Sequence, residues 1–256
     1  MYKGYLIDLD GTAYLGSKVI TETIDFTNKL KEKGIPFKFV TNNSSATEID
    51  VVNKLTSMGY NVDTQNIVTT ARATGNYLKR EKPDASVYII GSGGVVNALE
   101  DANIKITDDY TKADTVIVGL DQQVTYEKLA NACLAVRNGA TFISTNPDIA
   151  LPSERGMLPG NGSIAKVVET STEVEPITIG KPERHIMQEA LDQLELTNTE
   201  VAMIGDNYMT DIMSGVNMDI DTIFVNTGLT RREDLGKYDV PPTHICETLH
   251  DFMDKI

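Results

Sequence analysis

The chain has 256 residues, 41% of them hydrophobic, and a formal net charge of -14 at pH 7. This length suffices for one large domain or two small ones, and the apolar fraction suffices to build a packed core. The negative charge argues against nucleic acid or an anionic membrane as the main partner, but not against an anionic substrate, because a bound cation can reverse the local field.

The first predicted element organises the chain. An apolar run at 5–7 leads into Asp8, Asp10, Gly11 and Thr12. Such a run is typical of a buried parallel strand, and Gly11 allows a tight turn at its end. Residues two apart on a strand point the same way, so Asp8 and Asp10 converge at its carboxyl end, where open α/β sheets bind ligands. Paired carboxylates of this kind suit Mg2+, although the pattern alone fits a structural turn equally well.

The strand–helix alternation continues to about residue 80. We expect a short hairpin at 13–20, helices at 21–33, 45–58 and 70–80, a strand at 37–40 and a short apolar segment at 67–68. The strand at 37–40 ends in Thr41-Asn42-Asn43-Ser44, a cluster of small hydrogen-bonding side chains. Ser45 and Glu48 have the spacing of a capping box for the next helix.

After a linker at 81–84 the alternation starts afresh, which predicts a second α/β unit. We expect strands at 87–90, 116–118 and 142–143, helices ending near Ala102, at 125–138 and at 163–170, and a Gly- and Pro-rich loop at 151–162. Gly91-Ser92-Gly93-Gly94 lacks the third glycine of a dinucleotide fingerprint, because Val96 stands there, and is interpreted as a tight turn. Asn146 and Asp148 follow a strand and fit either a turn or a substrate contact.

The last part returns to the same pattern. We expect strands at 175–179, 201–204, 222–225 and 244–246, and helices at 185–194, from about Thr210 to 218, and at 247–256. Repeated strand–helix units predict a parallel sheet with right-handed crossovers.

Complementary polar groups follow four of the predicted strands: Asp8 and Asp10, Thr41 and Asn42, Lys181, and Asp206 with Asp211. Taken alone, Lys181 fits a solvated lysine and Asp206 a carboxylate at a helix N-terminus. Together they supply the nucleophile, metal ligands, cationic clamp and small donors that phosphoryl transfer requires.

The motifs D-x-D-G-T, T-N-N-S, G-K-P and G-D-N-x-x-T-D, spread over the whole chain, resemble those of the haloacid dehalogenase superfamily of phosphatases. The inserted α/β block stands where that superfamily places its larger (type C2) cap. With T-N-P-D inside the block, the chain resembles the NagD-like (p-nitrophenylphosphatase) subfamily. The resemblance implies an α/β fold: a Rossmann-like, doubly wound parallel sheet formed by 1–80 and 178–256, with a smaller α/β cap at 81–177 that sets substrate specificity.

The resemblance also implies roles for individual residues. Asp8 is expected to attack phosphorus and form an aspartyl-phosphate, and Asp10 to protonate the leaving oxygen and then activate water. Mg2+ is expected on the side chains of Asp8 and Asp206 and the backbone carbonyl of Asp10, with Asp211 acting directly or through water. The expected ligands of the phosphoryl group and substrate are Thr41, Asn42, Lys181 and Asn146.

The implied function is a Mg2+-dependent phosphomonoesterase acting on small phosphorylated metabolites, such as nucleoside monophosphates or sugar phosphates. Three alternatives stay open: a phosphotransferase or phosphomutase with the same core, a phosphoaspartate signalling module, and a nucleotide-binding protein without chemistry. Signalling receivers have similar acids and a lysine, but about half this length and no inserted cap.

A cytoplasmic location is expected. Cys133 and Cys246 are far apart in sequence and fit reduced thiols. The N-terminus enters the first strand directly, so we expect no signal peptide, and no apolar run is long enough to predict a membrane-spanning helix. Whether the chain forms a homo-oligomer is left open.

Overall fold

The computed structural model describes residues 1–153 and 155–256, which group into two compact units. The first, here the core unit, contains Met1–Thr41, Ile49–Val68 and Lys181–Ile256. The second, here the inserted unit, contains Asn42–Glu48 and Thr69–Gly180. The prediction of an α/β fold with an inserted smaller α/β cap is confirmed. The catalytic role expected for residues 1–80 and 178–256 stays a prediction. So does the role of residues 81–177 in setting substrate specificity.

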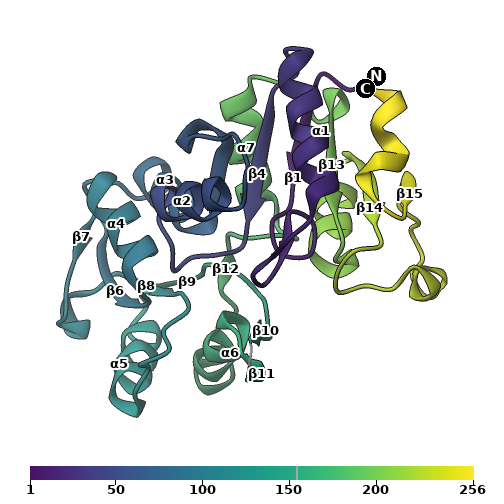
Figure 1. Cartoon of the computed structure of the whole chain (residues 1–256). Helices are drawn as coiled ribbons and strands as arrows, with labels where there is room; N and C mark the ends of the chain where they lie inside the picture. The colour runs from purple at the N-terminus through teal and green to yellow at the C-terminus, as the bar shows by residue number, and fades with distance from the viewer. Residues whose placement is uncertain (154) are drawn as a thin grey trace. The chain divides into compact units, whose positions relative to one another are not determined.

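The core unit is built on a six-stranded sheet (Figure 1). In spatial order its strands are β15 (His244–Cys246), β14 (Asp221–Val225), β13 (Val201–Gly205), β1 (Gly4–Ile7), β4 (Phe37–Thr41) and β5 (Ile67–Thr69). β1 pairs in parallel with both β13 and β4, so the carboxyl ends of these three strands lie at the same edge. Every residue of β1, β4 and β13 is buried, as expected for apolar strands covered on both faces.

The longer helices of the core unit are α1 (Thr21–Glu32), α2 (Glu48–Ser57) and α7 (Arg184–Leu194). α1 buries Phe26 and Leu30, and the ring of Phe26 packs edge-on against Tyr5 of β1 at 5.3 Å between centroids. The predicted hairpin is confirmed as β2 (Tyr14–Leu15) and β3 (Lys18–Val19), directly after the first carboxylates.

The inserted unit has its own parallel five-stranded sheet. The spatial order is β12 (Ile177–Thr178), β9 (Thr141–Ser144), β8 (Thr115–Val118), β6 (Ser86–Ile90) and β7 (Lys105–Ile106). Its helices are α3 (Thr70–Glu81), α4 (Gly93–Asp101), α5 (Tyr126–Arg137) and α6 (Asn161–Thr172). Side chains of β6, β8, β9, α5 and α6 form one apolar cluster, so this unit has a core of its own.

Three sequence-based predictions of local structure away from the acidic residues differ from the structure. The expected loop at 151–162 contains an antiparallel hairpin, β10 (Ala150–Ser153) with β11 (Gly156–Pro159). The prolines and glycines of this segment had favoured a loop. Glu154 lies outside the described residues. α2 begins at Glu48, so Ser45 does not cap it; instead the Asn43 side chain accepts from the Ser45 and Ala46 N–H groups. The final helix is a 3-10 segment, η6 (Leu249–Lys255).

Among the described residues, no helix combines the length and apolar character that crossing a membrane requires. Cys133 and Cys246 are both free cysteines.

Candidate active site

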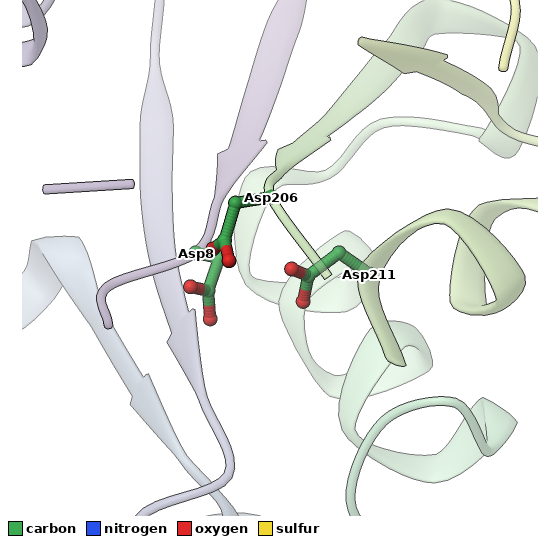
Figure 2. A group of neighbouring side chains, drawn as sticks. All are labelled: Asp8, Asp206 and Asp211. Carbon is green, nitrogen blue, oxygen red and sulfur yellow. The ribbon is translucent and has the colours of Figure 1, made fainter. Parts of the chain in front are cut away.

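Three buried carboxylates, from Asp8, Asp206 and Asp211, lie together in the core unit (Figure 2). One oxygen of each lies within 4.8 Å of the others. Asp8 follows β1 and Asp206 follows β13, and the parallel pairing of these strands brings the two side chains to one edge of the sheet. The sequence prediction that these distant segments meet is therefore confirmed for all three acids.

Asp211 reaches the group through an unusual helical turn. The expected helix from Thr210 to 218 is instead a π-helical turn, η4 (Tyr208–Ile212), followed by the short α8 (Met213–Val216). The side chain of Asp211 also accepts a hydrogen bond from the Asn207 N–H at 3.0 Å. π-helical turns are rare in proteins, but those that occur are often found at functional sites, because they shift side chains out of the regular helical register.

Lys181 joins two of the acids. Its Nζ lies 2.5 Å from Asp8 Oδ1 and 2.7 Å from Asp211 Oδ1, and the residue is 1% exposed. Burial alone would lower the pKa of Lys181, but the charges of Asp211 and Asp8 outweigh it and hold the pKa above its ordinary value. The ammonium is therefore charged at neutral pH.

The route to Lys181 differs from the prediction. The sequence placed it after a strand at 175–179, whereas β12 spans only Ile177–Thr178 and pairs with β9 in the sheet of the inserted unit. Lys181 is thus the first residue of the core unit's final segment and does not follow a strand of the core sheet.

Asp206 is contacted by two loops, one with Gly11 and Thr12 and the other with Gly228 and Leu229. Its carboxylate accepts hydrogen bonds from Thr12 Oγ1 at 3.2 Å and from the Leu229 N–H at 2.6 Å. A Cβ atom added at Gly11, whose φ is +95°, would lie 2.3 Å from this carboxylate, and one added at Gly228 would lie 2.1 Å from it. Both loops therefore require glycine where they approach Asp206.

Negative charge exceeds positive charge within this group. Burial and the nearby Asp211 raise the pKa of Asp8 well above its ordinary value, with Lys181 opposing the rise. Burial, followed by Asp211, raises the pKa of Asp206 to about 7, although the hydrogen bonds from Leu229 and Thr12 favour the ionised form. Three ionised carboxylates with one ammonium are two positive charges short, which fits a divalent cation held by hard oxygen ligands.

Asp10, two residues after Asp8 in the chain, is not part of the group of three. The residue is exposed, and its Oδ2 accepts a hydrogen bond from the Tyr14 hydroxyl at 3.3 Å. Partial burial of the carboxylate raises the pKa of Asp10, opposed by Lys54, the Tyr14 hydrogen bond and Lys181. Thr41, the last residue of β4, is buried at the strand end beside β1.

The remaining predicted residues, Asn42 and Asn146, belong to the inserted unit. The Asn42 carbonyl accepts from Asn146 Nδ2 at 2.8 Å and from Thr70 Oγ1 at 2.9 Å. Asn42 Nδ2 lies 3.2 Å from each carboxylate oxygen of Asp148. Asn146 and Asp148 therefore fix the backbone and side chain of Asn42, while contact of Asn146 with substrate stays a prediction.

Sequence reasoning missed four contributors: Thr12, Tyr14, Gly228 and the backbone of Leu229. Thr12 belongs to the recognised D-x-D-G-T motif, and Gly228 stands just after the predicted strand at 222–225. That strand, β14, pairs with β13, which carries Asp206 at its end. The small residues after β14 could therefore have indicated a loop that contributes to the site. Tyr14 carried no such signal, because an aromatic residue in a hairpin is ordinarily core.

The sequence matches two family models. One, described as haloacid dehalogenase-like hydrolase, matches residues 5–105, and another, described as HAD-hydrolase-like, matches residues 178–252. An acid sugar phosphatase of Staphylococcus saprophyticus is 49% identical, covering 100% of this chain and 98% of that protein. The 5'-nucleotidase YutF of Bacillus subtilis is 48% identical, covering 100% of this chain and 99% of that protein.

Solved structures agree with these matches. A p-nitrophenyl phosphatase from Archaeoglobus fulgidus superposes with a TM-score of 0.94 at 34% identity, covering 100% of this chain and 99% of that one. A double mutant of the thermostable NPPase from Geobacillus stearothermophilus superposes with a TM-score of 0.92 at 45% identity, covering 98% and 97% of the two chains.

Proposed function

Because the chain belongs to the haloacid dehalogenase-like hydrolase family, we propose that it is a Mg2+-dependent phosphomonoesterase of small phosphorylated metabolites. The observation that carries this proposal is the buried Asp8–Asp206–Asp211 group with Lys181 inside it. The similarity to an acid sugar phosphatase and a 5'-nucleotidase favours sugar phosphates and nucleoside monophosphates as substrates.

Asp8 is the proposed nucleophile. Lys181 contacts its Oδ1, which fixes the carboxylate and leaves Oδ2 to attack phosphorus. A bond forms between Oδ2 and phosphorus as the bond from phosphorus to the ester oxygen breaks, giving an aspartyl-phosphate on Asp8. Lys181 also offsets part of the repulsion between the carboxylate and the phosphate dianion.

Asp10 is the proposed acid and base. It gives its proton to the departing ester oxygen, so that an alcohol leaves rather than an alkoxide. In the second half of the reaction the ionised Asp10 takes a proton from water, whose oxygen attacks phosphorus and releases Asp8 and inorganic phosphate. Burial raises the pKa of Asp10, which favours the protonated form that the first step needs.

Mg2+ is proposed on Asp8, Asp206 and the Asp10 backbone carbonyl, with Asp211 binding directly or through water. When bound, it would supply positive charge that offsets repulsion between the phosphate and Asp8. The excess of buried carboxylate and the raised pKa values of Asp8 and Asp206 support a divalent cation here.

Three further assignments rest on the family resemblance. Thr41, Asn42 and Lys181 are proposed to hold phosphoryl oxygens, and Asn146 to contact substrate. Residues 81–177 are proposed to form the cap that selects the leaving group. Two free cysteines and no described membrane-spanning helix are compatible with the proposed cytoplasmic location.

The test is inorganic phosphate release from a panel of sugar phosphates, nucleoside monophosphates and p-nitrophenyl phosphate, measured with Mg2+ and with EDTA. We expect multiple turnovers with Mg2+, none with EDTA, and none from the Asp8→Asn variant. Phosphate transferred to an added alcohol without net release would favour a phosphotransferase. A stable phosphoprotein formed in one equivalent without turnover would favour a signalling module, and either result would overturn the hydrolase proposal.

A further inference from the structure

We propose that Tyr14 is a positioning residue for Asp10. The Tyr14 hydroxyl donates a hydrogen bond to Asp10 Oδ2, so that Asp10 Oδ1 is the oxygen that exchanges a proton with the substrate. Lys54, which lies on the Tyr14 ring, is proposed to support it. This inference rests on the proposed acid–base role of Asp10.

The hydroxyl contact is built into a tight loop. The Gly11 N–H donates to the Tyr14 carbonyl at 2.8 Å, and the Tyr14 N–H donates to the Leu9 carbonyl at 3.2 Å. These bonds fix the backbone of Tyr14 against the residues on either side of Asp10. Tyr14 is 4% exposed, so its ring is packed, whereas Asp10 is exposed.

The consequence for proton transfer follows from the direction of the bond. A neutral carboxylic acid carries one proton, and the oxygen that accepts from Tyr14 is the poorer place for it. The proton of Asp10 is therefore expected on Oδ1, ready for the ester oxygen. The separation of 3.3 Å between the Tyr14 hydroxyl oxygen and Oδ2 is long, and catalytic hydrogen bonds often shorten once substrate is bound.

Lys54 acts on Tyr14 from α2. Its Nζ lies 3.5 Å from the centroid of the Tyr14 ring, within the range of a cation–π contact. A cation over a phenol ring draws electron density from it, which makes the hydroxyl a better donor. The same contact holds the ring in place, although Lys54 itself is exposed.

The experiment compares two phosphate esters that differ in their need for a proton. p-Nitrophenolate leaves without protonation, whereas an alkoxide from glycerol phosphate or a sugar phosphate does not. For Tyr14→Phe we expect kcat/KM to fall about tenfold for the alkyl ester and less than about threefold for p-nitrophenyl phosphate. Because kcat/KM reports steps up to release of the alcohol, it is insensitive to the later use of Asp10 as a base.

The matched control is Tyr60→Phe. Tyr60 is a buried tyrosine of the same region whose hydroxyl donates to the Ala13 carbonyl at 2.7 Å. Its loss should alter stability without changing the ratio of kcat/KM for the two esters. Lys54→Met, which keeps the stem and removes the charge, should change that ratio in the same direction as Tyr14→Phe but by less.

The outcomes distinguish failure of this positioning role from failure of the proposed function. Equal losses for both esters in Tyr14→Phe, or an unchanged alkyl-ester rate, would overturn the positioning role alone. Failure of the wild-type enzyme to hydrolyse either ester would overturn the proposed function first. If Tyr14→Phe does not fold, as judged by its melting temperature, the ratio measured for Lys54→Met decides.

Discussion

Lys181 Nζ lies 2.7 Å from Asp211 Oδ1, and both residues are 1% exposed. Breaking a buried ion pair strongly destabilises the folded state, because removing one partner leaves the other charge without compensation. Here the same ammonium also contacts Asp8, so one side chain connects the proposed nucleophile to the π-helical turn.

Lys181→Met is expected to destabilise the metal-free protein by about 3 to 5 kcal/mol, because it leaves Asp8 and Asp211 unpaired. Urea unfolding in the presence of EDTA measures this. Lys3→Met is the matched control, since the Lys3 ion pair with Glu200 is at the surface and its removal should leave the midpoint almost unchanged. Equal midpoints for the two variants would contradict a structural role for the Lys181 pairs.

Asp206→Asn is expected to weaken Mg2+ binding by at least about tenfold, because it removes one of three carboxylates that would offset the ion's charge. Isothermal titration of the metal-free protein with Mg2+ measures the affinity directly. Asp25→Asn serves as control, as its carboxylate pairs with His250 at the surface. Unchanged Mg2+ affinity in Asp206→Asn would place the metal elsewhere.

The metal-free protein is expected to lose stability as pH rises from about 4 to about 7. The pKa of Asp206 is 3.8 when unperturbed and about 7 in the folded protein, so in this window the folded state binds more protons than the unfolded state. The contribution of protonated Asp206 to the free energy of unfolding is present at acidic pH and is lost as pH rises through the folded pKa. It amounts to about 4 kcal/mol at most.

Thermal melting across this pH range with EDTA tests that sign. Saturating Mg2+ should flatten the decline, because a bound cation takes over the charge compensation that the proton supplies. A metal-free stability that rises between pH 4 and pH 7 would show that the burial of Asp206 and its repulsion by Asp211 do not control the pH dependence.

Gly228→Ala is expected to reduce both stability and Mg2+ affinity. Its Cβ would lie 2.1 Å from Asp206 Oδ2, well inside contact distance, so either the loop or the carboxylate must move. Gly236→Ala is the control, because a Cβ there meets nothing within 4 Å. Equal behaviour of the two variants would mean that the loop yields without disturbing Asp206.

Much of the fold could be predicted because its signals are local. Buried parallel strands such as β1 and β13 are apolar along their whole length, and their glycine and polar terminations mark the strand ends. The β10–β11 hairpin could not be predicted, because Pro152 and Gly156 favour a loop in sequence, and only the pairing partner decides otherwise.

The acids of the site could be predicted from their motifs, but their surroundings could not. The contact of Leu229 with Asp206 uses a backbone N–H, which leaves no trace in residue type. The hydroxyl of Tyr14 on Asp10 depends on how a two-residue strand returns after the turn. The π-helical turn that carries Asp211 differs from an α-helix only in hydrogen-bond register, so the sequence suggested an ordinary helix.

The narrow space around Asp206 has an evolutionary consequence. Because Gly11 and Gly228 both lie against its carboxylate, the acid has no room for a longer homologue, and Asp206→Glu would not be a conservative exchange. Neither loop can acquire a side chain while the acid stays in place. Mutational drift at any one of these three positions should therefore be tolerated only together with change at the others, although they lie in widely separated parts of the gene.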